Sequence, residues 1–275
     1  MRRPVETALF TLVSIGGNCA AMPLDTIINI FHSEADNVGD QMCGPAQYLW
    51  PTKFQNIPLG SRPSHHVDAV VIGGGQIFSQ MSEALASIYD QNPRAKAVAW
   101  GVGLPPLGRR NQLVTELAEC FAAFGTRNYD RREQFSFVPC ASCLSPLFDR
   151  VGPATHDLVA YVHRKKRGPE ELPPDIPIMT NSMRPLREVI EFIASGDTVV
   201  TSSYHGVYWA QLLGRKVICL PYNDKFETFQ HSPTMAEPGS WLRAMGSALR
   251  TEPMLEEYRA LNQAFAVRAM DIWCD

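Results

Sequence analysis

The chain has 275 residues, of which 45% are hydrophobic, and a formal net charge of −3 at pH 7. Its length suits one large globular domain or two of ordinary size. With this weak negative charge, the chain lacks the excess of basic residues that is typical of a nucleic-acid-binding protein. No apolar run is long enough to span a bilayer.

The amino terminus has the outline of a signal peptide. Arg2 and Arg3 precede the apolar stretch 8–15, and Cys19 with the two alanines after it resembles a cleavage site. A proline and a glutamate interrupt this outline, and a first helix packed on the sheet explains the segment equally well. The seven cysteines are an odd number spread along the chain, which does not suggest a disulfide framework. We therefore expect a cytoplasmic protein.

Short apolar runs alternate with amphipathic helical segments along the rest of the chain. Continuously apolar runs rich in Val, Ile and Ala are typical of parallel strands buried on both faces. We predict strands at Thr26–Phe31, Val67–Ile72, Ala95–Trp100, Phe121–Thr126, Leu158–His163, Ile176–Met179, Thr198–Thr201 and Val217–Leu220. We predict helices at Asn111–Ala123, Arg184–Ala194 and Pro253–Trp273. The alternation predicts an α/β fold of two Rossmann-like, doubly wound halves with a central cleft.

The boundary between the halves is expected near residue 150. Between Pro139 and Asp157, proline, cysteine, serine and glycine replace the periodic pattern of strands and helices. We therefore predict domains at residues 1–150 and 151–275, with a closing carboxyl-terminal helix in the second.

Three glycine-bearing turns follow strands in the first half. They are Asn37-Val38-Gly39-Asp40, Gly73-Gly74-Gly75 and Gly101-Val102-Gly103. Glycine lets the backbone approach a ligand closely. None of the turns fits the dinucleotide fingerprint or the phosphate-binding loop, so neither a nicotinamide cofactor nor a nucleotide bound to such a loop is expected. Asp40 is either a base for a sugar hydroxyl or a cap of the next helix.

Cys140 and Cys143 form a C-x-x-C pair. A zinc site needs further ligands at a suitable spacing, and the sequence has no second pair of this kind. The neighbouring Pro139 and Pro146 favour a tight loop over a thioredoxin-type motif. We expect a structural role or a contact with an acceptor, with metal or redox chemistry as the alternative.

The turn from Thr201 to Gly206 is the most informative part of the sequence. It lies between a predicted strand and a short helix, and it carries Ser202, Ser203 and His205. Such a turn places a helix amino terminus, two hydroxyls and an imidazole at the carboxyl edge of a parallel sheet, where anions bind. His205 is therefore placed to contact a phosphate or to move a proton, unless it is a packed histidine in an ordinary helix cap.

Basic side chains that follow strands are candidates for binding a carboxylate or phosphate. Arg127 and Lys225 each lie just beyond a predicted strand, and Arg184 begins a predicted helix. The run Arg164–Arg167 is more typical of a solvated surface.

Taken in order, these motifs resemble the polysaccharide pyruvyltransferase family. The resemblance is carried by Asn37-x-Gly39-Asp40, Gly73-Gly74-Gly75, Trp100-Gly101-x-Gly103, Arg127-x-x-Asp130, Ser203-Tyr204-His205-Gly206 with the helix after it, and Lys225-Phe226. The chain departs from the family at two places. Ser203 stands where many members have an arginine, and the Arg-Asp pair is spread over residues 127–130. Arg184 or the basic run 164–166 would substitute for the missing arginine.

The resemblance implies transfer of a pyruvyl group from phosphoenolpyruvate to a sugar of a cell-surface polysaccharide precursor, which forms a cyclic ketal. It also implies a two-domain scaffold of the GT-B type, with the acceptor on the first domain and the donor on the second. For this reaction we expect His205, as acid or phosphate partner, and Asp40 to be catalytic. The expected donor-binding residues are Ser202, Ser203, Tyr204, Gly206, Arg127, Lys225 and Arg184. The expected acceptor-binding residues are Asn37, Gly39, Gly73, Gly74, Gly75, Gly101 and Gly103.

This route requires no metal and no other cofactor. A lipid-linked acceptor would bring the protein to the inner face of the membrane, where Trp241 and Trp273 would be available for contact. Two alternatives stay open. One is a glycosyltransferase that uses a nucleotide sugar. The other is a relative that binds a sugar or anion without catalysis, an alternative that the serine at position 203 in place of arginine supports.

Overall fold

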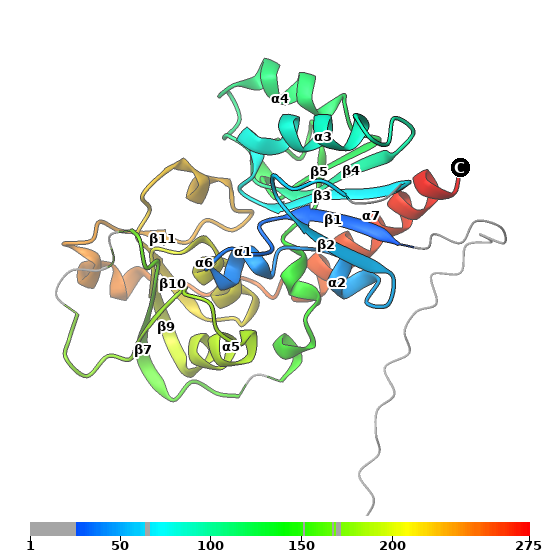
Figure 1. The fold of residues 1–275 in the computed structure, drawn as a ribbon. Coiled ribbons are helices and arrows are strands. Elements are labelled where there is room, and N and C mark those ends of the chain that lie inside the picture. The colour runs from blue at the N-terminus through cyan, green and yellow to red at the C-terminus, as the bar shows by residue number, and fades with distance from the viewer. Residues whose placement is uncertain (1–25, 64–66, 151, 167, 169–171) are drawn as a thin grey trace, which may run out of the picture.

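Two parallel β-sheets, each flanked by helices, make up the protein (Figure 1). The computed structural model describes residues 26–63, 67–150, 152–166, 168 and 172–275. The signal-peptide outline and its alternative, a first packed helix, lie outside these residues, as does Arg167. The two sheets confirm the predicted α/β class with two Rossmann-like halves, the arrangement called GT-B-like.

The first sheet has six strands in the order β2-β1-β3-β4-β5-β6. These strands are β1 (Ile27–Phe31), β2 (Phe54–Pro58), β3 (Ala69–Gly75), β4 (Lys96–Val102), β5 (Ala123–Thr126) and β6 (Ser136–Phe137). All four strands predicted for this half are present. Two further strands were not predicted: β2, a largely exposed edge strand, and β6, which has two residues. Neither has the continuous apolar run that identifies a strand buried on both faces.

Helices cover both faces of the first sheet. Side chains alternate between the faces of a strand, so Val70 and Ile72 pack toward α3 (Met81–Tyr89) and α4 (Asn111–Ala118). Ala69 and Val71 point to the other face, which α7 covers. In Figure 1 the sheet lies between α3 and α4 on one side and α7 on the other.

The second sheet repeats the strand order of the first. Its strands are β7 (His156–Val162), β8 (Ile178–Thr180), β9 (Gly196–Thr201), β10 (Lys216–Cys219) and β11 (Thr234–Met235), in the order β11-β10-β9-β7-β8. Read from β8, this is the β2-β1-β3-β4-β5 order of the first half. All four strands predicted here are present, and every strand pairing in both sheets is parallel.

Helices α5 (Leu186–Ser195) and α6 (Tyr204–Leu212) pack on one face of the second sheet. All nine residues of α6 are buried, so this helix lies inside the molecule. The short helices α1 (Val38–Gln41) and α2 (Ala46–Leu49) follow β1. Short 3₁₀ helices lie at Phe78–Gln80, Tyr129–Arg131, Ala141–Leu144, Pro146–Asp149, Asp224–Thr228 and Trp241–Ser247.

The last helix, α7 (Leu255–Cys274), returns to the first half. Phe265, Ala266, Ala269 and Trp273 pack on the outer face of the first sheet, next to Trp100. This helix was predicted to belong with residues 151–275. Its carboxyl-terminal part instead packs on the first sheet, whereas Tyr258 near its start stacks on Tyr208 of α6. The boundary at residue 150 stays a prediction. In the described part of the chain, no helix has the length and apolar character needed to traverse a bilayer.

Candidate functional site

The carboxyl ends of strands from both sheets converge on one cavity of about 120 Å³. His32 follows β1 and Gln76 follows β3, while His163 follows β7 and Ser203 lies just beyond β9. In each sheet the strand order reverses between these two strands. That reversal point is where open α/β sheets bind their ligands. The other described residues that line the cavity are Asn37, Asp40, Arg127, Tyr204, His205 and Lys225.

Arg127 is a buried cation of this cavity, with 5% of its surface exposed. Its guanidinium lies 3.8 Å above the ring of Tyr204, and Nη2 is 3.5 Å from Oε1 of Gln76. Its Nη1 atom is buried and has no hydrogen-bond partner among the described residues. Buried polar groups are almost always hydrogen-bonded, so this N–H is available to an anion that enters the cavity.

The ring of Tyr204 lies directly beneath the guanidinium of Arg127. This ring stacks on Phe229, with centroids 4.4 Å apart and an angle of 17° between the planes. The stack fixes the position of the guanidinium, because a cation is attracted to the face of an aromatic ring. Burial raises the pKa of Tyr204 to about 12, so its hydroxyl keeps its proton near neutral pH.

Lys225 adds a second cation. Its Nζ atom donates a hydrogen bond to the hydroxyl of Tyr222 and lies 4.5 Å from the centre of that ring. Burial, followed by the charge of Arg127, lowers the pKa of Lys225 from 10.5 to about 8. The amine is therefore mostly charged at neutral pH and able to release its proton just above it.

His163 is a further polar group of the cavity. Burial and the nearby Lys225 lower its pKa, which favours the neutral imidazole. Its Nδ1 atom accepts a hydrogen bond of 3.1 Å from the backbone N–H of Lys165. The proton of the neutral ring is then on Nε2, which makes that nitrogen a donor.

Asp40 is the carboxylate that lines the cavity, and it does not cap α1. The cap is Asn37, whose Oδ1 accepts a hydrogen bond of 3.1 Å from the backbone N–H of Gly39. Asn37 Nδ2 donates to Asp40 Oδ2 at 2.7 Å. The amide therefore holds the carboxylate beside the cations of the cavity.

His205, in the first turn of α6, lies between the cavity and two buried cysteines. Its Nε2 atom is 3.3 Å from Sγ of Cys43 and 3.5 Å from Sγ of Cys140. Its Nδ1 atom faces Gly39, where a β-carbon would stand only 2.1 Å away. A glycine is therefore required at position 39 for the imidazole to occupy this place.

The two thiols next to His205 have opposite tendencies to ionise. Burial opposes ionisation of Cys140, but hydrogen bonds from Cys43 and His205 outweigh it and hold the pKa of Cys140 well below its usual value. The hydrogen bond to Cys140 and then burial raise the pKa of Cys43. Among the described residues, Cys43, Cys140 and His205 form the one group whose donor atoms are close enough together to hold a metal ion.

Cys143, the second member of the C-x-x-C pair, lies apart from this group. Its Sγ atom accepts a hydrogen bond of 3.5 Å from Nδ2 of Asn262, and burial raises the pKa of its thiol to about 12. Cys140 is therefore paired with Cys43, which lies 97 residues away, and not with its neighbour in sequence.

Several predicted site residues support the cavity without lining it. Ser202 is buried and accepts a hydrogen bond of 3.1 Å from the backbone N–H of His163. Gly206 faces Thr201, since a β-carbon there would lie 2.1 Å from Oγ1 of Thr201. Gly103 permits two cavity residues to approach, because its β-carbon would lie 2.4 Å from Oε1 of Gln76 and 3.0 Å from Nη2 of Arg127. The turn glycines Gly39, Gly73, Gly74, Gly75 and Gly101 do not line the cavity either. Of these, Gly39 packs against His205 and Gly74 against Cys43.

The expected substitutes for the missing arginine are not at the cavity. Arg184 does not line it, and neither does the basic run 164–166. Arg164 instead forms an ion pair with Asp36, and its backbone N–H donates to Oδ1 of Asn181 at 2.9 Å. These contacts tie β7 and β8 to the loop before α1 and leave Arg127 and Lys225 as the cations of the cavity.

Four residues of the site were not predicted: His32, Gln76, His163 and Cys43. The first three are polar residues immediately after a strand, a signal that the sequence does contain. Cys43 has no such signal, because its partners are distant in the chain.

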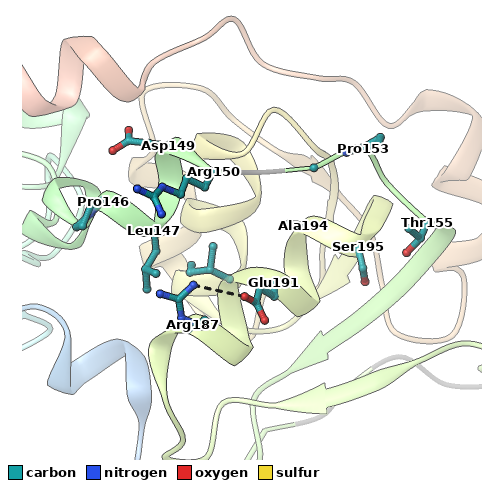
Figure 2. Close-up of a pocket in the computed structure, with 12 residues that line it drawn as sticks. Pro146, Leu147, Asp149, Arg150, Pro153, Thr155, Arg187, Glu191, Ala194 and Ser195 are labelled. Atoms are coloured by element: carbon teal, nitrogen blue, oxygen red, sulfur yellow. Dashed lines mark ion pairs between the residues drawn. The ribbon is translucent and has the colours of Figure 1, made fainter. Parts of the chain in front are cut away.

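A larger hollow of about 470 Å³ lies between α5 and the segment that joins the two halves (Figure 2). Arg187 and Glu191 form an ion pair of 3.7 Å on its wall, and both side chains are exposed. None of the predicted site residues is among the described residues that line it. The described residues that line it include no buried charged side chain, and we assign it no function.

A model of the family described as polysaccharide pyruvyl transferase matches residues 24–224. No curated protein matches the chain. Among solved structures, an uncharacterized protein from Klebsiella pneumoniae is similar at 17% identity with a TM-score of 0.51, over 78% of this chain and 93% of that one. A protein from Listeria monocytogenes described as a UDP-N-acetylglucosamine 2-epimerase is similar at 11% identity with a TM-score of 0.41, over 92% and 91% of the two chains. The likeness to the Klebsiella protein concerns the fold alone.

Proposed function

The chain belongs to the polysaccharide pyruvyl transferase family, and on that premise we propose that it transfers the pyruvyl group of phosphoenolpyruvate to a sugar of a polysaccharide precursor. The product is a cyclic ketal that bridges two hydroxyls of that sugar. Inorganic phosphate is the other product.

The buried guanidinium of Arg127 is the observation that carries this proposal. It is fixed on Tyr204, has an unpaired N–H, and forms no ion pair with a carboxylate among the described residues. Lys225 and the imidazoles of His163 and His205 line the same cavity. Phosphoenolpyruvate carries a carboxylate and a phosphate, which cationic and N–H donors of this kind bind.

The volume of the cavity favours a small donor. Pockets for drug-sized ligands measure about 300 to 1,000 Å³, whereas this cavity measures about 120 Å³. A three-carbon phosphate ester suits that space better than a nucleotide sugar does.

The reaction begins with a proton that is added to the methylene carbon of phosphoenolpyruvate. The neighbouring carbon becomes cation-like and is attacked by a sugar hydroxyl, which loses its proton. The carbon–oxygen bond to phosphate then breaks, and a second hydroxyl attacks the same carbon to close the ketal. A general acid, a general base and a group that stabilises the leaving phosphate are needed.

The residues of the cavity can supply these three roles. Lys225, with its lowered pKa, suits the proton donor, and Asp40 suits the base for the hydroxyl. His205 suits the phosphate partner better than the acid, because its Nε2 atom is turned toward two sulfur atoms. Its Nδ1–H would then donate a hydrogen bond to phosphate, and the positive end of the α6 dipole would attract the same anion.

Thermal unfolding with phosphoenolpyruvate, compared with a panel of nucleotide sugars, tests the proposal. A ligand at about 100 times its Kd stabilises the folded state by about 2.7 kcal/mol. We expect a raised Tm with phosphoenolpyruvate that is lost in Arg127→Met, which keeps bulk above Tyr204 but no charge. Arg132→Met is the matched control, because Arg132 also lies over a tyrosine ring, that of Tyr129, but on the surface.

Release of inorganic phosphate in the presence of acceptor sugars then distinguishes catalysis from binding. A Tm shift with a nucleotide sugar alone would replace the proposal with sugar transfer. A shift with phosphoenolpyruvate but no phosphate release with any polysaccharide precursor would indicate a binding protein.

A further inference from the structure

Three soft donor atoms from distant parts of the chain meet beside the cavity. Cys43 follows α1 in the first half, Cys140 lies in the segment that joins the halves, and His205 belongs to α6 in the second half. We propose that these three residues bind one zinc ion, which joins the two halves of the protein. The proposal concerns metal binding and does not rest on the proposed transferase function.

The distances among the donor atoms fit a single tetrahedral ion. Zinc binds thiolate at about 2.3 Å and imidazole at about 2.0–2.1 Å. In a tetrahedron with these bonds, two sulfurs lie about 3.8 Å apart, and a sulfur and a nitrogen lie about 3.6 Å apart. The sulfurs of Cys43 and Cys140 are 3.7 Å apart, and His205 Nε2 is 3.3 Å from one and 3.5 Å from the other.

The type of donor selects the kind of ion. Two thiolates and an imidazole suit zinc, whereas magnesium and calcium require oxygen ligands. An iron–sulfur cluster holds its cysteines around several metal atoms, and these three atoms are close enough to surround only one. Cys43, Cys140 and His205 are 1%, 2% and 4% exposed, so the ion would be bound in the interior of the protein.

Neighbouring groups hold the donors in place, as expected around a metal site. The hydroxyl of Ser142 lies 3.3 Å from Sγ of Cys140 and accepts a hydrogen bond of 3.0 Å from Nε1 of Trp209. The hydroxyl of Tyr208 donates to the carbonyl of Cys140 at 2.7 Å. Three protein ligands leave the fourth position of a tetrahedral ion open.

Zinc on Nε2 would also fix the tautomer of His205. The ring proton is then on Nδ1, the nitrogen that faces Gly39 and has no hydrogen-bond partner among the described residues. The ion would thereby make His205 a permanent donor at the wall of the cavity.

Metal analysis of the full chain, purified under reducing conditions with zinc supplied and then removed by dialysis, tests this site. We expect about one zinc ion per chain in the wild type. Cys43→Ser and Cys140→Ser should bind zinc at least about 100-fold more weakly. Cys143→Ser is the matched control, since Cys143 is equally buried in the same loop but lies outside the group, and Cys120→Ser controls for an exposed thiol.

Cobalt(II) loading of the wild type gives a readout that needs no variant, in case a serine variant does not fold. We expect sulfur-to-cobalt charge transfer and the intense visible bands of tetrahedral cobalt. A wild-type protein without zinc and without these bands would overturn the proposal, as would equal zinc contents in Cys140→Ser and the wild type. Loss of two reactive thiols without any bound metal would also overturn it and would indicate a Cys43–Cys140 disulfide.

Discussion

Gly39 and His205 lie in contact across the boundary between the two halves, so closely that no side chain fits between them. A β-carbon on residue 39 would be 2.1 Å from Nδ1 of His205 and 2.6 Å from its Cγ. The position of the imidazole therefore depends on a residue that precedes it by more than 160 positions.

Gly39→Ala should displace His205 or α1. We expect the free energy of unfolding to fall by about 1–3 kcal/mol, as for other overpacked sites, and the Tm shift with phosphoenolpyruvate to disappear. Urea unfolding and thermal unfolding with ligand measure the two effects. Gly246→Ala is the control, because a β-carbon there meets nothing within 4 Å. Unchanged stability and ligand response in Gly39→Ala would contradict the observed packing.

Lys225 should make the affinity for phosphoenolpyruvate depend on pH. Because its pKa is lowered to about 8, the ammonium loses its charge as the pH rises through this value. We expect the affinity measured by calorimetry to decline above about pH 8, by up to about tenfold per pH unit. In Lys225→Arg the guanidinium stays charged, so the decline should vanish. The same decline in both proteins would show that another group is responsible.

The same lowered pKa has the opposite effect on folding. Between about pH 8 and 10.5 the unfolded chain binds a proton at Lys225 that the native protein has released. The contribution of this residue to the free energy of unfolding therefore rises with pH in that window, while ligand affinity falls.

Asn262 should be a large contributor to stability. Its side chain accepts a hydrogen bond of 2.9 Å from Nε1 of Trp100 and donates to the carbonyls of Pro139 at 3.2 Å and Tyr258 at 3.0 Å. Asn262→Ala leaves buried polar groups unpaired, and we expect a loss of about 2–4 kcal/mol in urea unfolding. Gln112→Ala, on the exposed face of α4, should change stability by less than about 0.5 kcal/mol. An Asn262→Ala effect as small as that of the control would count against this network.

Phe265 should stabilise the first half although it lies in the last helix. Its ring is edge-on to Trp100, with centroids 4.7 Å apart. Phe265→Ala should cost about 3–5 kcal/mol and should weaken hydrogen-exchange protection in β4. Val267→Ala, in the same helix but 43% exposed, should do neither. Loss of protection in β9 instead of β4 would place α7 with the second half.

Much of the fold could be predicted because its central strands are buried on both faces. The runs 69–72 and 217–220 are continuously apolar, and both lie largely within strands, β3 and β10. The edge strand β2 has the sequence Phe-Gln-Asn-Ile-Pro, which lacks that signal. The contact surface of α7 could not be predicted either, since an amphipathic pattern shows that a helix packs but not on which sheet.

The candidate site could be predicted in part for a related reason. Arg127, Lys225 and His205 all lie just beyond strands, and the carboxyl ends of parallel strands meet at one edge. The structure brings these three to one cavity. The contact between Cys140 and Cys43 could not be predicted in this way, because it depends on how one half of the protein packs against the other.

The return of α7 to the first sheet has a consequence for the order of events during synthesis. The strands of the first sheet are synthesised early, and domains usually fold as they leave the ribosome. Here the face formed by Ala69, Val71 and Val98 gains the cover of α7 only after the whole second half has been translated, although Trp50 covers part of it earlier. A nascent chain would therefore expose the α7 side of this apolar face for most of its elongation, and chaperones that bind apolar surfaces would recognise the chain there.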